Sequence, residues 1–279
     1  MKQRVITGAV MAAVAIPVFL FSGTVVYAAV LSLLCAVGVF ELLRVFSLQK
    51  NPAILIPSEI FALAAPLGAY FALVSGSFEA KRYLLLLALA AAVYCLYLFS
   101  VAVFAGGTVP FSRISGVFMS VTYVAAGFTG MSVLRYLPDG EYSFLLAFLG
   151  ACVCDVFAYF TGYLFGKHKL TPNISPKKTV EGSIGGMVFT VLAFVLYGFL
   201  LKTFADRTPN YLLLALSGLV LSVVSQIGDL SASLIKREYG IKDYGKLFPG
   251  HGGVMDRFDS TVAVALTMML ISVMAPPLI

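Results

Sequence analysis

VITGAVMAAVAIPVFLFSGTVVYAAVLSLLCAVGVF, residues 5–40, is a stretch without one charged side chain. A helix that crosses a bilayer needs about 20 predominantly apolar residues, so this stretch is too long for one crossing and fits two short ones. The segment FSGT (21–24) has the small and polar residues expected of a hairpin between them. Because the apolar residues are continuous and do not alternate with polar ones, the pattern indicates helices and not a β-barrel.

The whole chain has the composition of an integral membrane protein. Of its 279 residues, 60% are hydrophobic and 11% are charged, whereas a soluble domain carries about 25% charged residues. The mean hydropathy is +0.98. We therefore predict an all-α, polytopic membrane protein with about nine transmembrane helices. After the first hairpin, the expected spans are 54–75, 83–105, 112–134, 142–166, 183–201, 211–235 and 258–276.

The distribution of positive charge predicts the orientation in the membrane. Loops rich in Lys and Arg stay on the cytoplasmic side. If the N-terminus is cytoplasmic, few of the 19 Lys and Arg residues face the opposite side, namely Lys81, Arg82, Arg135, Lys202 and Arg207. The N-terminus is therefore predicted to be cytoplasmic and the C-terminus outside. This bias also accounts for the net charge of +6 without a nucleic-acid partner.

Two polar segments interrupt the apolar chain: KHKLTPNISPKKTVEG (167–182) and KREYGIKDYGKLFPGHGGVMDR (236–257). Two predicted spans separate them, so both segments lie on the same side of the membrane, which the charge distribution identifies as the cytoplasm. We accordingly divide the chain into N-terminal transmembrane helices (1–140), expected to serve as scaffold and for lipid access, and a C-terminal catalytic region (141–279) that holds both polar segments.

Four aspartates lie in or at the cytoplasmic ends of the late spans: Asp155, Asp229, Asp256 and Asp259. Asp256 and Asp259 are three residues apart and share one helix face. Oxygen donors without a nearby cysteine suit a hard divalent ion such as Mg²⁺, so we predict a metal site at Asp229, Asp256 and Asp259. The simpler alternative for Asp256 and Asp259 is ion pairing with Arg257 and the preference of helix N-termini for Asp. Asp155 is interpreted as a lysine partner, a supporting group or a further ligand.

The first polar segment carries groups that bind polyphosphate. SPKKTVEGSIGG (175–186) places two lysines and a threonine before three glycines, which offers positive charge, hydrogen-bond donors and close approach of the backbone. A loop that contacts anionic lipid headgroups is the alternative. In the second segment, LFPGHGGVMD (247–256) places His251 between a glycine-rich turn and the predicted metal ligands.

No Ser-His-Asp or Cys-His combination is recognisable in the sequence, which suits a reaction whose substrate supplies its own nucleophile. A phosphate monoester can do so, because it is mostly dianionic at neutral pH. Catalysis then needs positioning and neutralisation of charge, which metal ions and lysines provide. The residues therefore predict a membrane enzyme that handles phosphates at the cytoplasmic surface.

The stretch SQIGDLSASLIKREYGIKDYGKLFPGHGGVMDRFDS (225–260) resembles the phosphatidate cytidylyltransferase (CDP-diacylglycerol synthase) family. A second stretch, DVFAYFTGYLFGKHKLTPNISPKKTVEG (155–182), is similar to an upstream block of the same family, except that Val156 stands where a small hydroxyl residue is common. Both stretches lie in the C-terminal half. The similarity of the first is carried by Ser233-x-x-Lys236-Arg237, by Lys242-Asp243 and by His251-Gly252-Gly253-x-x-Asp256-Arg257-x-Asp259.

This resemblance implies an activity and a set of site residues. Members of the family join CTP and phosphatidic acid into CDP-diacylglycerol and release pyrophosphate, with Mg²⁺ required; the presence and identity of a second metal ion are left open. By resemblance, the metal ligands are Asp229, Asp256 and Asp259, and these three with Lys178 are the catalytic residues. The residues expected to bind substrate are Asp155, Lys167, Ser175, Lys177, Lys178, Thr179, Glu181, Lys236, Arg237, Lys242, Asp243, His251 and Arg257.

The expected partners are CTP, phosphatidic acid and membrane lipids, with no nucleic acid, and glycine-rich apolar helices are compatible with a homodimer. The expected location is the inner (plasma) membrane, with the active site facing the cytoplasm. One alternative function is another membrane phosphotransferase that uses lipid phosphates, although the D-G-x-x-A-R motif of CDP-alcohol phosphotransferases is absent. The other is a cation-coupled transporter, which would require polar residues along a route through both leaflets.

Overall fold

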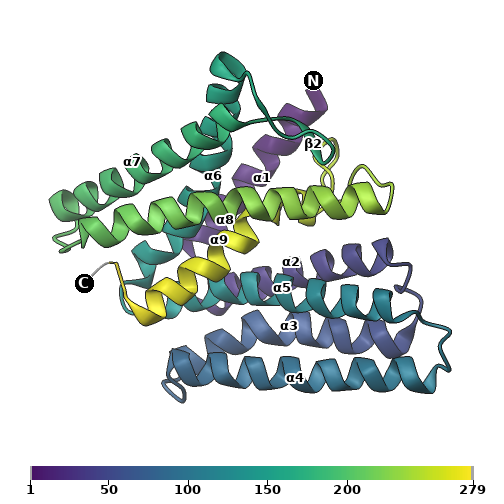
Figure 1. The fold of residues 1–279 in the computed structure, drawn as a ribbon. Helices are drawn as coiled ribbons and strands as arrows, with labels where there is room; N and C mark the ends of the chain where they lie inside the picture. The colour runs from purple at the N-terminus through teal and green to yellow at the C-terminus, as the bar shows by residue number, and fades with distance from the viewer. Residues whose placement is uncertain (1, 278–279) are drawn as a thin grey trace. The chain divides into compact units, whose positions relative to one another are not determined.

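The computed structural model describes residues 2–277, with only the backbone for residues 2–5. The described residues form nine helices and one antiparallel hairpin (Figure 1). The helical prediction is confirmed, whereas the hairpin, which lies in the first polar segment, was not predicted. In chain order the elements are α1 (Lys2–Leu20), α2 (Val25–Val45), α3 (Pro52–Val74), α4 (Ala80–Phe104), α5 (Phe111–Tyr136), α6 (Gly140–Phe165), β1 (Lys169–Thr171), β2 (Ser175–Thr179), α7 (Val180–Phe204), α8 (Tyr211–Glu238) and α9 (Met255–Met274).

Eight of the helices in the described part of the chain, α2 to α9, are long and apolar enough to cross a membrane, and α1 has a shorter apolar part, Ile6–Leu20. The protein is thus an integral membrane protein with multiple apolar spans. The predicted break at FSGT is confirmed, because Thr24 is the N-cap of α2 and its Oγ1 accepts a hydrogen bond from the backbone N–H of Val26 at 3.3 Å. The orientation stays a prediction; it also counted Lys2 and Arg4, whose side chains lie outside the described part.

The helices belong to two compact units. The first contains the chain up to Leu137 together with Asp243–Arg257, and the second contains Pro138–Lys242 and the chain from Phe258 onward. Within the first unit, α2 packs on α3 and α5, and α4 packs on α3 and α5; within the second, α7 packs on α6 and α8 (Figure 1). The first turn of α9 belongs to the first unit and the rest of α9 to the second.

Two prolines lie inside α3, and the structure shows how one of them is accommodated. Pro57 has no N–H and cannot donate to the carbonyl of Ala53 one turn earlier. The hydroxyl of Tyr97, on α4, donates to that carbonyl at 2.8 Å instead. In a bilayer every backbone polar group must find a partner within the protein, so this bond allows α3 to continue through the proline.

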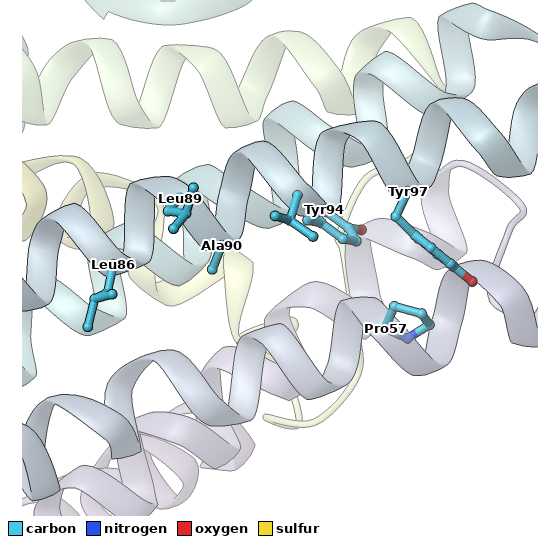
Figure 2. A pocket seen from close by; sticks show the side chains of 7 residues that line it. Pro57, Leu86, Leu89, Ala90, Tyr94 and Tyr97 are labelled. Carbon is cyan, nitrogen blue, oxygen red and sulfur yellow. The ribbon is translucent and has the colours of Figure 1, made fainter.

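The same two helices border an apolar groove with a cavity volume of about 460 Å³ (Figure 2). No charged side chain lines it, and the two tyrosine hydroxyls are occupied: Tyr97 bonds to α3, and the hydroxyl of Tyr94 lies 2.7 Å from that of Ser58. The groove can hold an apolar group but offers phosphate no partner. Its lining residues are Pro57, Leu86, Leu89, Ala90, Val93, Tyr94 and Tyr97.

In the second unit, α6 and α7 meet through glycines. A Cβ at Gly182 would lie 2.6 Å from the carbonyl oxygen of Ala158, and a Cβ at Gly186 would lie 3.0 Å from that of Cys154. A Cβ at Gly185 would collide with Thr161. These glycines therefore allow α7 to pack closely on α6, a role that the sequence did not indicate, and their approach to phosphate stays a prediction.

Candidate active site

Three aspartates of the second unit come together from three different helices. Asp155 lies on α6, Asp229 on α8 and Asp259 on α9, and their carboxylates are close enough to interact electrostatically. Gly228 permits this approach, since a Cβ there would lie 2.7 Å from the carbonyl oxygen of Asp259. We refer to Asp155, Asp229 and Asp259 as the acidic cluster. The sequence predicted a metal site at Asp229, Asp256 and Asp259, with Asp155 as a lysine partner, a supporting group or a further ligand. The fold brings Asp155 close to two of these ligands, Asp229 and Asp259.

Lysines and hydroxyl groups surround the acidic cluster. Nζ of Lys178, in β2, lies 2.6 Å from Oδ2 of Asp229, and both side chains are about one-quarter exposed, at 26% and 29%. Lys236 interacts electrostatically with Asp259. The hydroxyl of Ser260 donates to Oδ2 of Asp155 at 3.0 Å. The cluster is thus partly neutralised by side chains and stays accessible from outside the protein.

The donor atoms of the acidic cluster are carboxylate oxygens, which a hard divalent cation prefers. Lys178 shows that a positive charge can reach Asp229. The residues present therefore fit Mg²⁺ chemically. Within residues 2–277, however, no three His, Cys, Asp or Glu side chains converge closely enough to hold a metal ion, so the metal site stays a prediction.

The hairpin β1–β2 carries the lysines of the first polar segment. Lys169 pairs with Thr179 and Thr171 pairs with Ser175 across it. Alternate residues of a strand face opposite sides, so Lys178 points to Asp229 while Lys177 is exposed. The predicted pair of phosphate-binding lysines is thus divided between the acidic cluster and the surface.

Two predicted substrate-binding residues have structural partners at the start of α7. Thr179 is the N-cap, and its Oγ1 accepts a bond from the N–H of Gly182 at 3.1 Å. Glu181 accepts bonds from the backbone N–H groups of Lys167 at 3.0 Å and His168 at 3.2 Å, and its Oε1 lies 2.6 Å from the His168 ring. Thr179 thus joins the end of β2 to α7, and Glu181 joins α7 to the segment before β1.

In the first unit, Asp256 closes the glycine-rich loop that precedes α9. Its Oδ2 accepts bonds from the N–H of Tyr244 at 2.7 Å and from the N–H of Gly253 at 2.9 Å. Gly252 has φ +87°, which favours glycine, and a Cβ there would lie 2.6 Å from Oδ2 of Asp256. Asp256 is therefore held by backbone donors of its own loop, a role that the sequence did not predict.

The remaining predicted residues lie on exposed or intermediate positions. Ser175 is partly exposed in β2, and Nε of Arg237 donates to the carbonyl of Ile174 at 3.3 Å. Nδ1 of His251 is buried without a hydrogen-bond partner among the described residues. Whether these residues contact substrate stays a prediction. Exposed side chains belong to Lys167, Lys177, Arg237, Lys242, Asp243 and Arg257.

Glu41, in α2, is a buried acid that sequence reasoning missed. It is 4% exposed, and its two oxygens accept bonds from the N–H groups of Val254 and Met255, each at 3.0 Å. A signal was available, because Glu41 is the first charged residue after the uncharged stretch 5–40 and lies in an apolar helix, where an acid needs a specific partner.

The comparisons with known proteins show the family of this chain. The model of the cytidylyltransferase family matches residues 2–275, which extends the similarity to the N-terminal helices. Proteins named phosphatidate cytidylyltransferase are similar to this chain: that of Staphylococcus haemolyticus is 45% identical over 146 residues (52% of this chain, 54% of the relative), and that of Staphylococcus saprophyticus is 41% identical over 157 residues (56% and 58%). The matched part of the chain spans about half the length of these curated relatives.

Proposed function

Because the chain belongs to the cytidylyltransferase family, and staphylococcal relatives are named phosphatidate cytidylyltransferase, we propose that it is a CTP:phosphatidate cytidylyltransferase. We place it in the cell (plasma) membrane. The observation that carries this proposal is the acidic cluster with Lys178 on Asp229, built on apolar helices and partly exposed. Apolar helices can hold the lipid substrate, and the partly exposed charged groups can meet a soluble nucleotide.

In the proposed reaction an oxygen of the phosphatidic acid phosphate forms a bond to the α-phosphorus of CTP. The bond between that phosphorus and the oxygen that bridges to the β-phosphate breaks, and pyrophosphate leaves with the electron pair. No protein nucleophile is needed, because the lipid phosphate is the nucleophile. The protein contributes by placing the two phosphates in line and by compensating their charge.

Lys178 and Lys236 are the side chains that would bind phosphate oxygens next to the acidic cluster. Lys178 is bound to Asp229, and a phosphate oxygen can replace this carboxylate as its partner. Asp229 and Asp259 would hold Mg²⁺, which supplies further neutralisation of phosphate charge when bound. The inclusion of Asp256 among the metal ligands rests on the sequence motif and stays a prediction.

The full chain, purified in detergent with CTP, phosphatidic acid and Mg²⁺, is expected to release pyrophosphate and form CDP-lipid in equal amounts. Diacylglycerol is the matched control substrate, because it has the same acyl chains and lacks the attacking phosphate. Removal of divalent ions with a chelator is expected to stop turnover, and added Mg²⁺ to restore it. The absence of CDP-lipid under all conditions, with Asp256→Asn indistinguishable from wild type, would falsify the proposal.

We further propose that the N-terminus and the segments 167–182 and 236–257 face the cytoplasm, because these segments carry many of the Lys and Arg residues. A single cysteine at Lys242, in a chain whose four cysteines are replaced by serine, should resist an impermeant thiol reagent in intact cells, whereas one at Arg82 should react. A homodimer stays a prediction, since the glycines of α7 pack within the chain.

A further inference from the structure

We propose that Glu41 is a positioning residue for the reaction: from the N-terminal half of the chain it fixes the loop 244–254 and the first turn of α9, and thereby orients Asp256. Its kinetic consequence rests on the proposed function with Asp256 as a metal ligand, whereas its structural part does not. The inference changes the expected role of α2, which the sequence assigned to the scaffold.

The first step is the bond pattern of Glu41. The N–H groups at the start of a helix have no partner within the helix, and those of Val254 and Met255 lie at the start of α9. Each oxygen of Glu41 accepts from one of them at 3.0 Å. A carboxylate at this end of a helix is favoured by the helix dipole. Two bonds to adjacent N–H groups fix both the position and the direction of the helix start, which a single bond would not.

The second step is the fit of the loop around this carboxylate. A Cβ at Gly245 or at Gly253 would collide with Oε1 of Glu41. These glycines come from the two ends of the loop, so the backbone encloses Glu41 from both sides. Gly245 and Gly253 thus bring the backbone of the loop close to the Glu41 carboxylate.

The third step is that one face of α2 holds the whole loop. Gly38, Glu41 and Arg44 are three residues apart and share this face. Arg44 donates to the carbonyl of Tyr244, and Gly38 makes room for Met255, whose sulfur would lie 3.2 Å from a Cβ at Gly38. α2 therefore holds both the first and the last residues of the loop.

The fourth step connects this face to Asp256. Oδ2 of Asp256 accepts from the N–H groups of Tyr244 and Gly253. Tyr244 is also bound by Arg44, and Gly253 lies against Glu41. A change at Glu41 therefore moves the donors that orient Asp256, although Glu41 precedes Val254 by 213 residues in the chain.

The test compares Glu41→Ala and Glu41→Gln with a matched control, Glu59→Gln. Glu59 lies in α3 of the same unit, and its Oε1 is buried without a hydrogen-bond partner among the described residues. In Glu41→Gln one oxygen still accepts, but the amide NH₂ faces a second donor. Two readouts are used on the full chain in detergent: steady-state kinetics at varied Mg²⁺, and hydrogen exchange of the backbone amides.

Loss of a group that supports a metal ligand typically costs 10- to 100-fold in metal affinity or activity. We expect Glu41→Ala to lower the apparent Mg²⁺ affinity by about 10- to 100-fold, to leave KM for phosphatidic acid unchanged and to recover part of its rate at high Mg²⁺. Exchange should accelerate at residues 244–256 and not in α3 or α5. Glu41→Gln should lie between wild type and Glu41→Ala, and Glu59→Gln should match wild type.

A folded Glu41→Ala protein with wild-type kinetics and wild-type exchange at residues 244–256 would overturn the inference. A second result would also overturn it: a loss of rate that high Mg²⁺ does not relieve, together with faster exchange throughout the first unit. This result would indicate that Glu41 has a general structural role. If wild type itself is inactive, the proposed function fails and the exchange experiment still decides the structural part. If Glu41→Ala does not fold, Gly253→Ala decides, because its Cβ displaces Glu41: local acceleration of exchange supports the inference and unchanged exchange contradicts it.

Discussion

The two compact units stabilise their carboxylates in different ways. In the first unit, Glu41 and Asp256 each accept two bonds from backbone N–H groups. In the second, Asp229 is paired with the side chain of Lys178 and Asp155 with that of Ser260. In both arrangements these carboxylates have a partner. An unpaired charge would be costly in a membrane protein.

This difference indicates that the carboxylates of the first unit have fixed partners, whereas those of the second unit have partners that a ligand can replace. A backbone N–H cannot move away without unfolding its loop, so the carboxylates of the first unit set geometry. A lysine side chain can rotate to another anion at small cost, so the carboxylates of the second unit can exchange their partner for a ligand. Variants of the carboxylates in the first unit should therefore change local order, and activity only through it, whereas variants of the carboxylates in the second unit should change activity directly.

The largest effect is expected for Asp229→Asn. The asparagine keeps an oxygen for Lys178 and nearly the same volume, so the free energy of unfolding should change little. Turnover should fall by about 10²- to 10³-fold, the cost of removing one electrostatic stabiliser from an active site. The measurements are CDP-lipid formation and denaturation in mixed micelles.

Glu238→Gln is the matched control, because it removes an exposed acid at the end of the same helix. The comparison between the units fails if Asp229→Asn loses stability in proportion to activity, since Asp229 would then stabilise the fold and not serve as an exchangeable partner for a ligand.

The next effect in size is expected for Lys178→Gln. Removal of a charged hydrogen-bond partner costs about 1.5–3 kcal/mol, which corresponds to a loss of roughly 10- to 100-fold in kcat/KM. Lys169→Gln changes an exposed lysine of the partner strand and should keep activity within about twofold, as surface substitutions contribute little. Equal losses in both variants would show that the hairpin acts through its net charge and not through the contact with Asp229.

The sequence predicted the helices well, because a span needs an apolar run of fixed length. The predicted break at residues 21–24 agrees with the end of α1 at Leu20 and the start of α2 at Val25. The acids of the second unit were also predictable, since Asp155, Asp229 and Asp259 are charged residues in apolar helices, and each needs a partner.

The contacts of the first unit were not predictable in the same way. The bond from Val254 to Glu41 connects residues 213 positions apart, and no local pattern indicates which buried acid meets which loop. The packing role of the glycines in α7 was not predictable for a related reason: a glycine needed for helix packing and one needed for a phosphate-binding loop look the same in a sequence. The partner of Gly182 is Ala158 on a neighbouring helix, and only the fold shows it.

A smaller effect, on stability, is expected for Gly182→Ala. Its Cβ would lie 2.6 Å from the carbonyl oxygen of Ala158, and overpacking of this kind costs about 1–3 kcal/mol. This tests whether the exchangeable site of the second unit depends on a rigid contact between α6 and α7. Gly8→Ala, where a Cβ would meet nothing within 4 Å, is the control and should not lower the free energy of unfolding. An unchanged free energy of unfolding in Gly182→Ala would show that the helices separate at no cost.

The smallest effect is expected for Tyr97→Phe, which leaves the carbonyl of Ala53 without its donor. Hydrogen bonds between membrane helices contribute about 0.6 kcal/mol on average, so the free energy of unfolding should fall by about this amount. Turnover should stay at the wild-type rate, because Tyr97 is a polar group of the first unit. Pro57→Ala supplies the control, because alanine restores an N–H that can donate to the same carbonyl within α3. In the Pro57→Ala background Tyr97→Phe should therefore cost less than in wild type. If the cost is the same in both backgrounds, the tyrosine stabilises α4 through packing, and the carbonyl left free by the proline is satisfied in another way.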